Sequence, residues 1–149
     1  MNVTRSCMLL VLVGLLSLPS FAQRHSSQGF ELGVRLGDTH GGNVTIDAVM
    51  PFLGSRLHAD ATFWDNGIVL AGLYDWKFPI ADGFIFYPGV GASLATGGEF
   101  NLAAVGEVGA EYAFDIPLTI GLDWRPAIGL INSDGFLAGG FGLNVRYRF

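Results

Sequence analysis

The stretch FGLNVRYRF, Phe141 to Phe149, decides the fold. Apolar side chains occupy every odd position of this stretch, and glycine, asparagine or arginine occupies every even position. Only a β-strand separates residues with a period of two into an apolar and a polar face. The apolar face is unbroken and ends on an aromatic residue; its members are Phe141, Leu143, Val145, Tyr147 and Phe149. Such a strand must pair along both edges and place this face against a protein core or against lipid.

The first 22 residues have the features of a secretory signal peptide. Arg5 supplies positive charge, Met8 to Leu18 form an apolar run, and Ser20-Phe21-Ala22 precedes a cleavage point with small residues. The run is shorter than the roughly 20 residues that a membrane-spanning helix needs. The only cysteine, Cys7, lies in this segment. We therefore expect an exported mature chain, residues 23–149, with neither disulfides nor thiol chemistry.

The composition of the mature chain is both acidic and apolar. Without Arg5 it carries 7 basic and 13 acidic residues, a balance that argues against nucleic-acid binding. Half of the whole sequence is hydrophobic and the mean hydropathy is positive, yet no apolar run of the mature part is long enough for a helical membrane span. Hydrophobic residues spread by alternation are typical of a membrane β-barrel.

Alternation recurs along the mature chain and predicts eight strands joined by short connections. The strands are expected at 30–37, 44–50, 57–64, 68–77, 84–94, 100–114, 118–125 and 141–149. Asp65-Asn66-Gly67 predicts a hairpin, and turns or loops are expected at Pro51 to Ser55, Phe78 to Gly83 and Ile131 to Gly135. We expect every strand to reach the length of about 9–11 residues that a tilted spanning strand requires, and we expect no helix.

Eight strands predict an all-β fold, an eight-stranded antiparallel up-and-down transmembrane β-barrel. An even number of strands places both termini on one side, the periplasmic side for this class of barrel. The connections at 50–56, 77–83 and 114–117 are then periplasmic turns, and those at 37–43, 64–67, 94–99 and 130–136 are extracellular loops. Aromatic residues gather near both ends of the expected strands, as interfacial belts require.

The inward faces of these strands carry charges of both signs. A barrel of eight strands is just wide enough to be filled by side chains, so these charges must pair. The expected ion-pair network consists of Glu31, Arg35, Asp60, Glu107, Glu111, Asp123, Arg125, Arg146 and Arg148. Further inward positions are Asp47, Asp75 and Lys77, and inward glycines leave room for the long side chains. This pattern favours a plugged interior over a continuous channel.

Five segments resemble the small outer-membrane β-barrel proteins found widely in Bacteroidota, which are similar in architecture to OmpA- and OmpX-type barrels. They are GVRLGD (33–38), AGLYDW (71–76), YPGVGA (87–92), EYAFDIPLTIGLDWRPAIGL (111–130) and GLNVRYRF (142–149). The resemblance implies an outer-membrane location, with lipid, lipopolysaccharide and other outer-membrane proteins as neighbours. The terminal aromatic strand, Phe141 to Phe149, resembles the signal that the barrel-assembly machinery reads during insertion.

The sequence offers few candidate catalytic or metal-binding residues. His58 and Asp60 share an inward face and Ser55 or Ser93 offers a hydroxyl, but no His-x-Ser-Asn pattern of a lipid A deacylase is present. His25, His40 and His58 do not converge on this topology, so we expect no metal, no cofactor and no catalytic residue.

We therefore expect an integral outer-membrane protein with a structural or membrane-organising role. Three alternatives stay open. The first is a narrow passage or binding site for small hydrophobic molecules, and the second is a lipid A-modifying enzyme. The third is a soluble lipocalin-like barrel, which would carry its apolar residues inside and its polar residues outside.

Overall fold

The protein is described by a computed structural model over residues 29–38, 42–132 and 135–149, and the expected signal peptide, His25 and His40 lie outside these ranges. The described residues form eleven strands and no helix that could cross a membrane. The strands are β1 (Glu31–Gly37), β2 (Val44–Phe52), β3 (Ser55–Trp64), β4 (Gly67–Asp75), β5 (Phe78–Ala81), β6 (Phe84–Thr96), β7 (Asn101–Ala113), β8 (Leu118–Trp124), β9 (Ala127–Ile131), β10 (Phe136–Leu137) and β11 (Phe141–Arg148).

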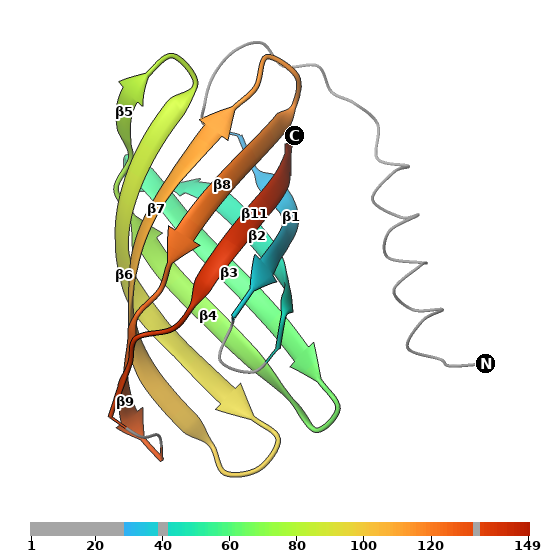
Figure 1. The fold of residues 1–149 in the computed structure, drawn as a ribbon, viewed down its shortest axis with the longest axis vertical. Coiled ribbons are helices and arrows are strands. Elements are labelled where there is room, and N and C mark those ends of the chain that lie inside the picture. The colour runs from blue at the N-terminus through green and yellow to red at the C-terminus, as the bar shows by residue number, and fades with distance from the viewer. Residues whose placement is uncertain (1–28, 39–41, 133–134) are drawn as a thin grey trace, which may run out of the picture.

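Eight of these strands close into an antiparallel barrel, which confirms the expected fold class (Figure 1). The ring runs β1-β2-β3-β4-β6-β7-β8-β11, and the terminal strand closes it by pairing with β1. In the register of this closing pair, Glu31 lies opposite Arg148 and Gly37 opposite Gly142. The C-terminus lies at the same end of the barrel as the β5–β6 and β7–β8 connections, at the top of Figure 1.

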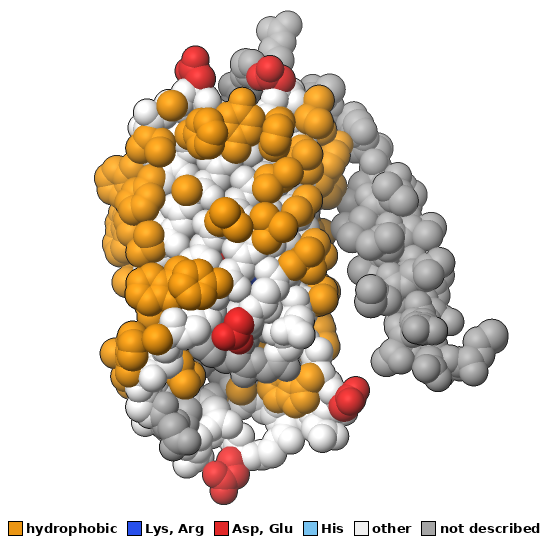
Figure 2. All heavy atoms as spheres, in the orientation of Figure 1, with side chains coloured by type: hydrophobic (Ala, Val, Ile, Leu, Met, Phe, Trp, Pro, Cys, Tyr) orange, Lys and Arg blue, Asp and Glu red, His pale blue; other side chains and the backbone are white. Residues whose placement is uncertain are grey.

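The barrel carries its apolar side chains outside and its polar side chains inside. Large exposed hydrophobic residues occur on every strand of the ring, and Figure 2 shows them spread over one face, with acidic side chains at its upper edge and in its lower part. In β11, for example, Leu143 is exposed while Asn144 and Arg146 are fully buried. The period-two alternation is the direct cause of this separation. The distribution is the reverse of that of a lipocalin-like barrel.

β5 corrects the expectation of a turn from Phe78 to Gly83. It pairs with the beginning of β6, placing Phe78 opposite Phe86, and the turn is limited to Asp82 and Gly83. The amide of Trp76 donates to the carbonyl of Pro88, so β4 and β5 follow one another along β6. The hairpin therefore extends past the ring at the end that holds the C-terminus (Figure 1).

β9 and β10 were not expected at all, because residues 126–130 carried no strand prediction and Ile131 was assigned to a loop. β9 continues the pairing of β8 with β7: Val108 lies opposite Trp124, and Val105 opposite Ala127. The interruption falls at Pro126, which has no amide hydrogen to donate to the ladder. β10 pairs only with β9 among the described strands, and both lie outside the closed ring.

Two further expectations about strand ends were wrong. Pro51 does not end the second strand, which continues to Phe52, and Leu53 and Gly54 alone make the turn to β3. Both turn residues have positive φ, 45° and 80°, as a tight two-residue hairpin requires. In addition, β1 and β8 have only seven residues each, fewer than a spanning strand was expected to need.

Candidate functional site

The interior of the barrel is the candidate functional site, because buried charges are concentrated there. Four arginines and six carboxylates of the described residues are buried, and Glu31 joins them at one end. The buried arginines are Arg35, Arg56, Arg125 and Arg146, and the buried carboxylates are Asp47, Asp60, Asp75, Glu107, Glu111 and Asp123. Each arginine lies against at least one of these carboxylates, so the network consists of ion pairs between strands.

Arg35 of β1 binds Asp123 of β8 across the intervening strand β11. The Nη2–Oδ1 distance is 2.5 Å and the Nε–Oδ2 distance is 3.1 Å, a two-pronged contact that fixes both side chains. Nη2 also donates to the carbonyl oxygen of Gly140, and Asn144 donates to Asp123 Oδ2 at 2.7 Å. The pair thus joins three neighbouring strands on the inside of the barrel.

Arg125, which follows β8, reaches across the interior to two other strands. Its Nη1 pairs with Asp60 of β3, and its Nε donates to Glu107 Oε1 of β7 at 2.7 Å. Because β3 and β7 are not adjacent in the ring, this contact crosses the lumen. A side chain in that position blocks a straight path along the barrel axis.

Arg146 and Arg56 form a second bridge nearer to the end that holds the C-terminus. Arg146 of β11 contacts Glu31, Asp47 and Glu111, which belong to β1, β2 and β7. Arg56 of β3 donates to Glu111 at 2.6 Å, and its guanidinium carbon lies 4.2 Å from the ring centre of Tyr87. Glu111 therefore receives two arginines from opposite sides.

His58 of β3 lies completely buried between three carboxylates. Its Nε2 is 2.5 Å from Asp47 Oδ1. Its Nδ1 is 3.1 Å from Asp75 Oδ2 and 3.2 Å from Glu107 Oε2. Since both ring nitrogens face carboxylates from β2, β4 and β7, four strands of the network meet at this imidazole, as four meet at Arg146.

Glycines on neighbouring strands make room for the long interior side chains, as the sequence predicted. A Cβ on Gly142 would meet the guanidinium group of Arg35, and a Cβ on Gly109 would meet the ring of Tyr87. Tyr87 and Gly109 are direct cross-strand partners, so the ring lies flat over the glycine position. The absence of a side chain at these positions is therefore part of the packing of the interior.

Of the nine residues that the sequence assigned to the network, eight form the ion pairs described above, whereas Arg148, although opposite Glu31 in the register, is directed to backbone carbonyls. Its guanidinium group donates to the carbonyl oxygens of Phe114 and Ile116 in the β7–β8 turn. The sequence analysis missed Arg56, because Pro51 suggested a break beside it. Asp47, Asp75 and His58 were placed on the inward face but not in the network. Their shared inward parity was the signal that could have found them.

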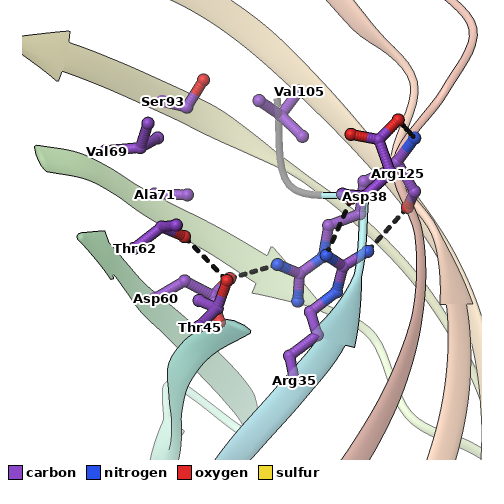
Figure 3. Close-up of a pocket in the computed structure, with 11 residues that line it drawn as sticks. Arg35, Asp38, Thr45, Asp60, Thr62, Val69, Ala71, Ser93, Val105 and Arg125 are labelled. Carbon is purple, nitrogen blue, oxygen red and sulfur yellow. Dashed lines mark hydrogen bonds and ion pairs between the residues drawn. The ribbon is translucent and has the colours of Figure 1, made fainter. Parts of the chain in front are cut away.

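A cavity lies at the other end of the barrel, beyond Arg35 and Arg125 (Figure 3). It offers about 50 Å³ of space. Thr45 and Thr62, whose hydroxyl oxygens are 2.7 Å apart, line it from β2 and β3. The lining residues on β4, β6 and β7 are Val69, Ala71, Ser93 and Val105. Arg35, Asp60 and Arg125 of the charged network also line this cavity.

The chain has no detected relative that would assign a role to these residues: no family model, no curated protein and no solved structure matches it.

Proposed function

We propose that this protein is an integral outer-membrane β-barrel with a closed polar interior and a structural or membrane-organising role. The observation that carries the proposal is the inside-out distribution of side chains. The buried set is dominated by charged and hydroxyl residues, while phenylalanine, leucine, isoleucine and valine are exposed around the ring. Water would penalise so large an apolar surface, whereas lipid tails accept it.

The ion-pair network supports a closed rather than a conducting barrel. Arg125 and Arg146 cross the lumen at different heights, and each is held by carboxylates of several strands. The cavity of Figure 3 holds about 50 Å³, well below the roughly 150 Å³ of an engineered protein cavity that accepts benzene. This favours a structural role over the passage of hydrophobic molecules.

The outer-membrane location and the likeness to small OmpA- and OmpX-type barrels are part of the same proposal. The predicted signal peptide, the exposed apolar surface and the aromatic terminal strand all support export and insertion by the barrel-assembly machinery.

The test is membrane fractionation combined with electrophoresis of unboiled and boiled samples. We expect the chain in the outer-membrane fraction and a mobility difference between the two samples, because a closed barrel in detergent resists unfolding until it is heated. A soluble protein without a mobility difference would contradict the proposal. Planar-bilayer recordings then test whether the interior is closed, and we expect no stable conductance. Open-channel currents would contradict the closed interior and indicate a pore.

A further inference from the structure

The interior network contains more negative than positive groups. Seven carboxylates, the six buried ones and Glu31, face four guanidinium groups in the described part of the chain. Three carboxylates therefore have no guanidinium counterpart, and Lys77, which lines a pocket with Glu31 and Glu111, offsets one of them. An uncompensated charge in a low-dielectric interior is costly, so a further positive group is required there.

The environment of His58 shows where that group can lie. Among the buried side-chain atoms without a hydrogen-bond partner are Glu107 Oε2 and Asp75 Oδ1. Glu107 is 2% exposed and Asp75 is fully buried. Arg125 occupies Oε1 of Glu107, which leaves Oε2 directed toward the imidazole at 3.2 Å from Nδ1. Glu107 Oε2 is thus a carboxylate oxygen without a hydrogen bond that faces Nδ1. Asp75 faces the same nitrogen with Oδ2, which also accepts a hydrogen bond from Nε of Arg56.

The spacing of these atoms matches that of metal ligands. His58 Nδ1 lies 3.1 Å from Asp75 Oδ2 and 3.2 Å from Glu107 Oε2, and one ligand atom of each of the three residues falls within 4.8 Å of the others. Ligand atoms bound tetrahedrally at about 2.0–2.1 Å from Zn²⁺ are separated by about 3.3 Å. Small side-chain movements are enough to bring the three atoms onto one ion.

Asp47 supplies the supporting contact that such a site needs. Its Oδ1 lies 2.5 Å from His58 Nε2 and accepts the proton of that nitrogen, which directs the lone pair of a neutral imidazole to Nδ1. A carboxylate on the far nitrogen is the usual partner of a metal-bound histidine, because it fixes the tautomer and the ring orientation. Asp47 is itself held by Arg146, so the contact is rigid.

We propose that His58, Asp75 and Glu107 form a site for one divalent transition-metal ion, of which Zn²⁺ is the probe, with Asp47 as the positioning residue. A divalent ion on a neutral His58 compensates the two carboxylates that Lys77 leaves unmatched, whereas a doubly protonated imidazole compensates only one. The guanidinium group of Arg125 contacts the imidazole, with Nη2 3.0 Å from Nε2 and 3.4 Å from Nδ1. Its charge opposes the ion, but the surplus of carboxylates offsets it. The site links β3, β4 and β7 and is independent of the membrane location proposed above.

The first experiment is refolding of the mature chain in detergent with excess Zn²⁺, followed by removal of loose metal with a chelator and measurement of bound zinc. We expect about one ion per chain for the wild type and its loss in His58→Gln and in Glu107→Gln. The matched control is Glu31→Gln, which removes a carboxylate paired with Arg146 but not adjacent to His58. It should retain the ion. Equal zinc in wild type and His58→Gln would assign the metal to the surface and overturn the proposal, as would a zinc-free wild type.

A second measurement covers the case in which His58→Gln does not fold. Co²⁺ replaces Zn²⁺ in the wild type, and the visible absorption of tetrahedral Co²⁺ reports the geometry. Asp47→Asn keeps all three ligands and should weaken the affinity roughly 10- to 100-fold. Co²⁺ bound without a tetrahedral spectrum, or with an affinity that Asp47→Asn leaves unchanged, would overturn the proposal and leave a protonated His58 as the charge that completes the network.

Discussion

The guanidinium group of Arg35 lies over Gly142, on the strand that separates it from its partner Asp123. Gly142 is the direct cross-strand neighbour of Asp123, so the arginine reaches its carboxylate by crossing the one position of β11 that has no side chain. Both charged residues are almost fully buried, at 1% and 0% side-chain exposure. The ion pair therefore depends on the absence of a side chain at Gly142.

Gly142→Ala should weaken the ion pair between Arg35 and Asp123. The added methyl group meets the guanidinium group of Arg35, which is held by Asp123 and by two backbone carbonyls, so we expect a loss of about 1–3 kcal/mol in the free energy of unfolding. Gly72→Ala is the matched control, since a Cβ at this outward position meets nothing. It should stabilise by about 0.4–1 kcal/mol by restricting the unfolded chain. Urea unfolding in lipid vesicles measures the change in the free energy of unfolding for both variants. Equal changes would contradict the inference that Gly142 makes room for Arg35.

Removing one member of the Arg35–Asp123 pair should cost more than removing both. Asp123→Leu leaves a buried guanidinium group without its carboxylate, and we expect a loss of about 3–5 kcal/mol. Arg35→Met combined with Asp123→Leu replaces the pair by apolar side chains and should lose less than the sum of the single changes. The double-mutant cycle is measured by the same unfolding assay. Additive losses would show that the two residues stabilise the barrel separately.

The outer face offers a test of the solvent that surrounds the barrel. Val90 lies at the centre of β6, points outward and is 55% exposed. In a bilayer, Val90→Arg places a charge near the midplane and should cost about 2–4 kcal/mol. Asp82→Arg, in the exposed β5–β6 turn, changes the charge in the same direction and should stay within about 0.5 kcal/mol. A similarly small effect at Val90 in vesicles would indicate that this face does not contact lipid.

The terminal aromatic residue should matter for assembly. Phe149 lies 5.7 Å from Phe30 and 5.0 Å from Tyr147 between ring centres, at the seam where β11 closes the barrel against β1. On the proposed function, the terminal aromatic residue is part of the signal that the assembly machinery reads, so we expect Phe149→Ala to reduce the heat-modifiable fraction in the outer membrane. Phe63→Ala, at the far end of β3, removes an exposed aromatic residue of the same kind and serves as the control. Equal heat-modifiable fractions of the Phe149→Ala and Phe63→Ala variants in the outer membrane would contradict a specific role of Phe149 in the assembly signal.

Local pattern explains which parts of the fold were predictable. The eight ring strands were found because alternation is a property of consecutive residues, and the inward parity of the charges followed from it. The strand ends were less accurate. Pro51 was given too much weight as a breaker, although an outward-facing turn of only Leu53 and Gly54 follows it. β5 was missed because all four of its residues are exposed and show no alternation. β9 does alternate, but it is short and Pro126 separates it from β8.

The sequence predicted that a charged interior exists, but it did not predict which charged residues contact one another there. Arg35 and Asp123 are 88 positions apart in the sequence, and Arg56 and Glu111 are 55 positions apart. No local spacing of residues therefore predicts either contact. Arg148 has the same parity as Arg146 but lies at the end of β11, where turn carbonyls are closer than any carboxylate.

The amino-acid sequence by itself determined that the chain forms strands, that eight of them build the barrel wall, and which side chains face inward. Period-two alternation contains all of this, since each residue's face depends only on its neighbours. Only the tertiary structure decided which charges meet. The pairings of β2 with β3, β3 with β4, β4 with β6 and β6 with β7 set the register that places His58 between Asp47, Asp75 and Glu107. A contact across the lumen depends on the relative heights of non-adjacent strands, which the alternation of one strand does not encode.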